Sequence, residues 1–149
     1  MTLPPLSVAL MLLAGIQTEF GFRTPPGALQ ELPTRTRQGF ICAVAYVHDG
    51  DTFRCTDGTR VRLSAIDTPE MPGACRPGRR CAPGSPYAAK AALEALIVGR
   101  TVRCEAVGTT YNRVAAWCSV GGVDLSCAMV RGGYAVRLPQ FDRERRLCR

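Results

Sequence analysis

The chain has 149 residues, with 19 basic and 12 acidic side chains and a formal net charge of +7. This length is enough for one domain with a hydrophobic core, and beyond its first residues no stretch is apolar enough to cross a membrane, which excludes a multi-spanning membrane protein. A cationic surface attracts phosphate-rich polymers, so nucleic acid is one interpretation of the charge, and an arginine bias of the genome is the other.

Eight cysteines are a high count for this length. An even number spread through a small chain is typical of disulfides formed in an oxidising compartment. A zinc site is the competing interpretation, but zinc ligands usually come as close cysteine pairs, often with histidine. Here the closest pair is Cys75 and Cys81, and His48 is the single histidine. The pattern therefore favours disulfides.

The N-terminal segment 3–16 is apolar, uncharged and too short to span a bilayer. It predicts a signal peptide or an N-terminal anchor at 1–16, followed by a Pro/Gly-containing linker at 17–38 and a folded domain at 39–149. We expect the protein to be secreted or periplasmic, with attachment to a membrane through an uncleaved N-terminus as the alternative.

Three β-strands are predicted at the start of the domain. Residues 40–48, 52–56 and 60–66 are rich in apolar and β-branched side chains. The dipeptides Asp49-Gly50 and Asp57-Gly58 separate them, and such pairs favour tight turns because glycine accepts positive φ without steric cost. The pattern predicts an antiparallel meander.

A helix is predicted after a Pro/Gly-rich loop at 69–85. Ser85 suits its N-cap, Pro86 its first position and Gly99 its C-terminal cap. Two further strands and two short helices are expected at 101–107, 114–120, 125–131 and 142–147. Mainly β structure in this order suits a five-stranded barrel of the OB-fold type with two or three short helices.

Three local groups carry the candidate chemistry: Asp49 to Thr52 (DGDT), Asp67 to Glu70 (DTPE), and the pair Arg62 and Arg113. Taken singly, they suit a hairpin turn, a polar turn and solvated strand arginines. Together they suit phosphodiester cleavage, which needs fixed cations for the phosphate oxygens and a carboxylate that activates water. Arg62 and Asp67 are an odd number of residues apart, so an ideal strand would point them to opposite faces, and a bulge or strand end must intervene.

The run from Val47 to Glu70, with Tyr111-Asn112-Arg113, resembles the staphylococcal nuclease (thermonuclease-like) family. The resemblance covers roughly residues 40–136 and rests on D-G-D-T, R-L-x-x-I-D-T-P-E and Y-x-R in this order. It implies a Ca²⁺-dependent nuclease that hydrolyses DNA or RNA and leaves 3′-phosphate ends.

The resemblance also implies residue roles. The implied Ca²⁺ ligands are the carboxylates of Asp51 and Asp67 and the backbone carbonyl of Thr68. Glu70 would be the general base or an orienting group. Arg62 and Arg113 would stabilise the transition state, and Tyr111 would lie near the substrate. Asn112 departs from the family pattern, which commonly has glycine at this position.

The cysteines are an addition to the family pattern. Positions on paired strands allow the bridges Cys42–Cys55 and Cys104–Cys118, a loop bridge Cys75–Cys81 is also expected, and Cys127 is then left with Cys148. Eight cysteines allow many other pairings.

Two alternatives to a nuclease remain open from the sequence. One is a non-catalytic OB-fold module that binds nucleic acid or a protein. The other is a disulfide-stapled secreted scaffold without a nucleic-acid partner. In each case we expect a monomer.

Overall fold

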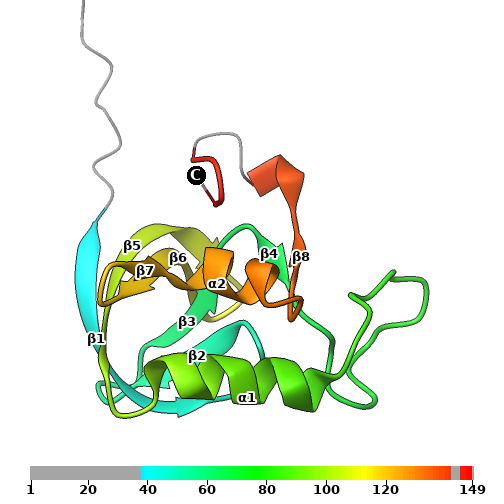
Figure 1. Cartoon of the computed structure of the whole chain (residues 1–149), viewed down its shortest axis with the longest axis horizontal. Helices are drawn as coiled ribbons and strands as arrows, with labels where there is room; N and C mark the ends of the chain where they lie inside the picture. Colours follow the sequence, from blue (N-terminus) through cyan, green and yellow to red (C-terminus); the bar gives the residue numbers. More distant parts are fainter. Residues whose placement is uncertain (1–37, 142–144, 149) are drawn as a thin grey trace, which may run out of the picture. The chain divides into compact units, whose positions relative to one another are not determined.

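The computed structural model describes residues 38–141 and 145–148. Five strands form a closed barrel through four antiparallel pairings and one parallel pairing (Figure 1). The strand order is β3-β2-β1-β5-β6, and parallel pairing of β3 with β6 closes it. The barrel strands are β1 (Gly39–Val47), β2 (Thr52–Cys55), β3 (Arg60–Leu63), β5 (Thr101–Thr110) and β6 (Arg113–Val120). The predicted meander and the OB-type barrel with short helices are confirmed. The expected segment 1–16 and nearly all of the linker lie outside the described residues.

Shorter strands add to the barrel. β4 (Ile66–Asp67) pairs with β8 (Val136–Arg137) in a separate two-stranded sheet, and β7 (Val123–Asp124) extends the main sheet beyond β6. The prediction of one continuous strand at 60–66 is wrong, because this segment is divided into β3 and β4. A 3₁₀ turn, η1, covers Pro139–Phe141. Of the helix expected at 142–147, the described residues 145–147 are not helical, and the others lie outside the described residues.

The two Asp-Gly turns contain glycine for different reasons. Gly58 has φ +88°, in the left-handed region that glycine adopts without penalty, as the sequence predicted. Gly50 does not have positive φ; a Cβ atom there would lie 2.7 Å from the Cβ of Ala89 and 3.0 Å from that of Thr68. The expectation of a positive-φ turn at Asp49-Gly50 is thus corrected: this glycine permits close approach of helix α1.

Two helices begin at the predicted caps. α1 (Pro86–Ile97) starts where the Ser85 hydroxyl accepts the amide of Ala88, with proline at the first position. α2 (Leu125–Arg131) starts where the Asp124 carboxylate accepts the amide of Cys127 at 2.9 Å. The predicted helix boundaries are confirmed to within one or two residues.

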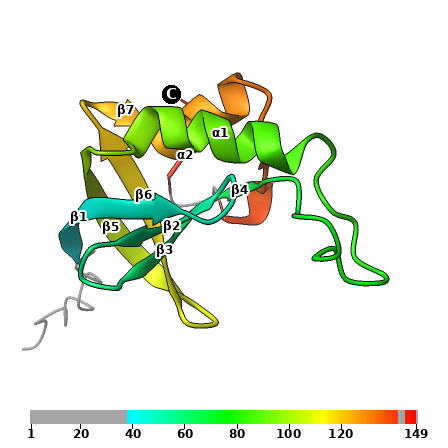
Figure 2. The ribbon, with the colours of Figure 1, turned by 90° about the horizontal axis from the view of Figure 1, so that it is seen from below.

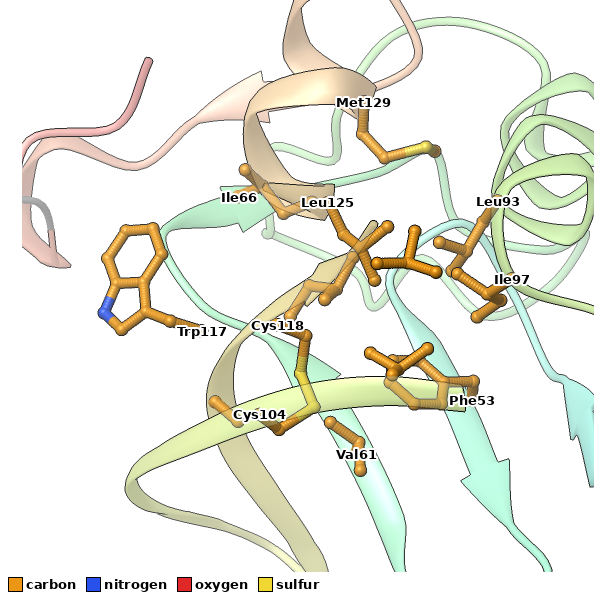
Figure 3. Packing of buried hydrophobic residues seen from close by; sticks show 14 of the residues in the cluster. Phe53, Val61, Ile66, Leu93, Ile97, Cys104, Trp117, Cys118, Leu125 and Met129 are labelled. Atoms are coloured by element: carbon orange, nitrogen blue, oxygen red, sulfur yellow. A yellow bond between two sulfur atoms is a disulfide. The ribbon is translucent and has the colours of Figure 1, made fainter. Parts of the chain in front are cut away.

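The hydrophobic core joins both helices to the barrel interior. Leu93 and Ile97 of α1 and Leu125 and Met129 of α2 are fully buried and point into one cluster (Figure 3). This packing fixes α1 and therefore also fixes the turn that contains Gly50. Seen from below, α1 lies across the barrel, and the β4–α1 loop projects from the body (Figure 2).

Four disulfides are present, and their pairing agrees with the expected one: Cys42–Cys55, Cys75–Cys81, Cys104–Cys118 and Cys127–Cys148. Cys104 and Cys118 lie directly opposite each other on β5 and β6, in the core (Figure 3). Four disulfides indicate an oxidising, extracellular-type environment. In the part of the chain that the structure describes, neither helix is long and apolar enough to cross a membrane.

Candidate active site

A cleft of about 690 Å³ opens where the β1–β2 turn, the end of β4, the β4–α1 loop and the β5–β6 hairpin tip meet. Its charged lining consists of four carboxylates and five guanidinium groups. All seven site residues predicted from the sequence line this cleft: Asp51, Arg62, Asp67, Thr68, Glu70, Tyr111 and Arg113. The fold therefore gathers side chains that are up to 62 positions apart, from Asp51 to Arg113.

Arg62 bridges the two aspartates at the floor of the cleft. Its Nη1 atom lies 2.7 Å from Oδ1 of Asp51, and its Nη2 atom lies 2.9 Å from Oδ1 of Asp67. Both carboxylates are buried, and only a fifth of the Arg62 side chain is exposed. Low solvent exposure strengthens these charge-assisted bonds relative to a surface ion pair.

A break between β3 and β4 allows Arg62 and Asp67 to face each other. Ala65 has φ +61°, a left-handed conformation that a non-glycine residue rarely adopts. Its neighbours hold it there: the Ala65 carbonyl accepts the amide of Leu138, and the Ser64 carbonyl accepts the buried hydroxyl of Ser126. The bulge or strand end that the odd spacing required is this turn.

Asp51 is the most deeply buried charge of the site. Its side chain also accepts the Thr52 hydroxyl at 2.8 Å, and its amide bonds to Oδ1 of Asp49. Burial raises the pKa of Asp51 to about 7, against the opposing effect of the Arg62 guanidinium. The protein's own cations thus do not fully compensate the desolvation of this carboxylate.

Arg113 reaches the same carboxylate through one hydroxyl group. Its Nη1 atom donates to the Thr52 hydroxyl at 3.2 Å, and that hydroxyl donates to Asp51. In the described part of the chain no carboxylate pairs with Arg113. Its guanidinium therefore keeps donors that no carboxylate occupies, at the lining of the cleft.

The hairpin tip presents Tyr111 to solvent. Tyr111 is 79% exposed, and the guanidinium carbons of Arg76 and Arg113 lie 5.8 and 5.9 Å from the centroid of its ring. Tyr111 has φ +53°, so the left-handed residue of this turn is Tyr111 and not Asn112. The Asn112 side chain instead accepts Nη1 of Arg60 at 2.9 Å.

Arg79 is a site residue that the sequence analysis missed. Its Nη1 atom lies 2.9 Å from Oε1 of Glu70, and its Nη2 atom lies 3.0 and 3.1 Å from the two carboxylate oxygens of Asp67. The facing carboxylates, Asp67 above all, raise the pKa of Arg79. An arginine in a Pro/Gly-rich loop carries no pattern that distinguishes it from its neighbours, and only the Cys75–Cys81 spacing hinted that the loop is constrained.

The expected Ca²⁺ ligands fit a hard cation by their chemistry. Carboxylate and carbonyl oxygens of Asp51, Asp67 and Thr68 are the donors that Ca²⁺ prefers. The undercompensated burial of Asp51 also favours an added positive charge. In the described ranges, however, no three histidine, cysteine, aspartate or glutamate side chains converge as a ready metal cage. Arg62 and Arg79 form ion pairs with the carboxylates of Asp51, Asp67 and Glu70.

No model of a known protein family matches the chain, and no curated protein matches it. The likeness to staphylococcal nuclease rests on the sequence motifs named above.

Proposed function

We propose that the protein is a Ca²⁺-dependent nuclease of the staphylococcal-nuclease type, which hydrolyses phosphodiester bonds of DNA or RNA to 3′-phosphate ends. One observation carries the proposal: Arg62 and Arg113 face the same cleft as Asp51, Asp67 and Glu70. Had either guanidinium pointed to the far side of the barrel, it could not act on the same phosphate.

The two arginines supply the electrostatic part of the mechanism. Charge builds on the non-bridging phosphate oxygens as water attacks phosphorus, and fixed donors stabilise that charge without reorganisation. Arg113 has no carboxylate partner among the described residues and meets a phosphate directly. Arg62 is held by two aspartates, so its orientation is fixed before substrate binds.

Glu70 supplies the base. Its Oε1 atom is held by Arg79 at 2.9 Å, and no described group bonds to Oε2. About a quarter of the side chain is exposed, so water in the cleft reaches it. In the proposed reaction Glu70 orients this water and accepts its proton as the water oxygen bonds to phosphorus. The P–O5′ bond breaks, and the leaving 5′ oxygen takes a proton from solvent to become the 5′-hydroxyl.

Asp51, Asp67 and the Thr68 carbonyl would hold the Ca²⁺ ion. When bound, such an ion polarises a phosphate oxygen and neutralises developing charge. The donor set and the buried, undercompensated Asp51 support this assignment.

The proposal is tested by incubating purified protein with single-stranded and duplex DNA and RNA, in Ca²⁺ or in excess chelator. We expect cleavage in Ca²⁺ only, and loss of cleavage in Arg62→Ala. Binding of nucleic acid without cleavage in Ca²⁺ would instead support the OB-fold binding module. If the protein neither binds nor cleaves nucleic acid, the disulfide-stapled scaffold without a nucleic-acid partner is the remaining interpretation.

We also propose that the site operates outside the cytoplasm, in a secreted or periplasmic protein. Four disulfides support this assignment, because thiols in the cytosol are kept reduced.

A further inference from the structure

Arg79 occupies the oxygens that a divalent cation would need. Its Nη2 atom contacts both carboxylate oxygens of Asp67, while Nη1 holds Glu70. Arg62 takes only one oxygen of Asp67, at 2.9 Å. Arg79 is thus the one described group that engages both oxygens of a candidate metal ligand.

A small covalent ring holds Arg79 in this place. The disulfide Cys75–Cys81 closes a loop with a sequence separation of 6, and Arg79 lies within it. Inside the ring the amide of Arg79 donates to the carbonyl of Arg76 at 3.1 Å. A closed ring restricts the backbone of the unbound loop, so less entropy is lost when the guanidinium docks.

We propose that Arg79 is a resident counter-ion of the metal site: its guanidinium fills the place of positive charge at Asp67 and Glu70 until a divalent cation displaces it from Asp67. The inference rests on the proposed function, because it takes the Ca²⁺ ligands from there. Arg79 then sets the affinity for the metal as a positioning residue and is not a catalytic group.

The local charges explain why displacement is needed. Among the groups joined by direct ion pairs, the carboxylates of Asp51, Asp67 and Glu70 face the guanidinium groups of Arg62 and Arg79, which leaves one negative charge when all three carboxylates are ionised. A divalent cation added to this set would make it positive, whereas a bound cation together with withdrawal of Arg79 makes it neutral. Because 44% of the Arg79 side chain is exposed, the guanidinium has room to leave. Arg62 is held at two aspartates in the cleft floor and has no such freedom.

The experiment measures Ca²⁺ binding directly, by titration calorimetry of the metal-free protein without substrate. The Arg79→Ala variant should bind Ca²⁺ about tenfold more tightly than the unmodified protein. The substitution removes the partly exposed ion pair with Asp67, which competes with Ca²⁺ for the carboxylate oxygens. Arg80→Ala is the matched control: it removes the same charge from the next position, but Arg80 is exposed and does not line the cleft. Its affinity should stay within about twofold of the unmodified protein.

The ring is tested with the double variant Cys75→Ser/Cys81→Ser. Ca²⁺ should bind more tightly than in the unmodified protein, and adding Arg79→Ala should then give a smaller gain than it gives with the ring intact. The ring lies outside the core, so unfolding temperatures should confirm that each variant is folded.

Two results would overturn the inference and leave the proposed function standing: equal affinity changes in Arg79→Ala and Arg80→Ala, or weaker binding in Arg79→Ala. Cleavage activity of the unmodified protein in Ca²⁺ identifies this case. If no variant binds Ca²⁺ and no cleavage occurs, the proposed cofactor and the role of Arg79 both fail.

Discussion

Arg113 donates to the hydroxyl of Thr52 at 3.2 Å, although 61 positions separate them in the chain. The Thr52 hydroxyl in turn donates to the carboxylate of Asp51, so the first residue of β6 is linked by hydrogen bonds to the turn that precedes β2. The closure of the barrel between β3 and β6 makes this possible, because it sets Arg62 beside Ala115, two positions after Arg113. Both arginines are therefore directed at one cleft by the strand register.

Replacing either arginine should remove most of the activity. Arg113→Ala and Arg62→Ala should each lower kcat by about 10²–10³-fold, as loss of one fixed charge-stabilising donor typically does. Initial rates on a fluorescent oligonucleotide in Ca²⁺ would measure the effect. Arg131→Ala is the control, because this exposed residue at the end of α2 does not line the cleft. Equal rates in all three variants would contradict the assigned roles.

The pH dependence of stability should reveal Asp51. Its pKa of about 7 in the folded protein lies above the usual value of about 4, so between these pH values the folded state binds more protons than the unfolded state. Stability contributed by Asp51 is therefore present at low pH and is lost as pH rises toward 7. The loss should be of the order of 4 kcal/mol without metal, because each pKa unit corresponds to about 1.4 kcal/mol.

Denaturant unfolding between pH 4 and pH 8, without metal, measures this contribution. Asp51→Asn should become more stable relative to the unmodified protein as pH rises, because the asparagine does not titrate. Saturating Ca²⁺ should cancel much of the difference, since it binds the ionised carboxylate. A stability difference that stays constant with pH would show that the pKa of Asp51 is not raised.

The contact between Gly50 and Ala89 should be sensitive to a single methyl group. Gly50→Ala should lower the free energy of unfolding by about 1–3 kcal/mol, because its Cβ would overlap that of Ala89. In an Ala89→Gly background the same substitution should cost less, and the double-mutant cycle would isolate the clash. Equal cost in both backgrounds would mean that the close approach of α1 does not require this glycine.

Arg76 should contribute to nucleic-acid binding without contributing to cleavage. Its guanidinium lines the cleft beside Tyr111 and forms no ion pair with a described residue. In a Glu70→Gln background, Arg76→Ala should reduce the slope of log Kd against log salt by about one. Arg103→Ala, on an exposed position of β5 outside the cleft, should leave the slope unchanged. An unchanged slope for both variants would remove Arg76 from the binding surface.

Much of the fold could be predicted from local sequence signals. Apolar and β-branched runs, the Asp57-Gly58 turn and the caps Ser85 and Asp124 define the strands and helices because each acts within a few residues. The disulfide pairs on β1–β2 and β5–β6 follow from strand pairing. These signals do not depend on distant contacts, which is why they survive in a single sequence.

The unpredicted features depend on tertiary structure. The sequence Ser64-Ala65-Ile66 does not predict the left-handed conformation of Ala65. This conformation depends on hydrogen bonds from Ser126 and Leu138, which are distant in the chain. The role of Gly50 comes from a helix that begins 36 positions later, at Pro86. The Cys75–Cys81 ring was expected, but the sequence does not show that Arg79 in this ring reaches Asp67 and Glu70.

The end groups of the cleavage products test the proposed nuclease most directly. Purified protein is incubated with a defined oligonucleotide in Ca²⁺, beside a chelator control and Glu70→Gln, and the termini are identified by mass spectrometry. We expect 3′-phosphate and 5′-hydroxyl ends, none with chelator, and a rate about 10²–10⁴-fold lower in Glu70→Gln. Intact oligonucleotide in Ca²⁺, or cleavage that persists at full rate in both controls, would contradict the assignment.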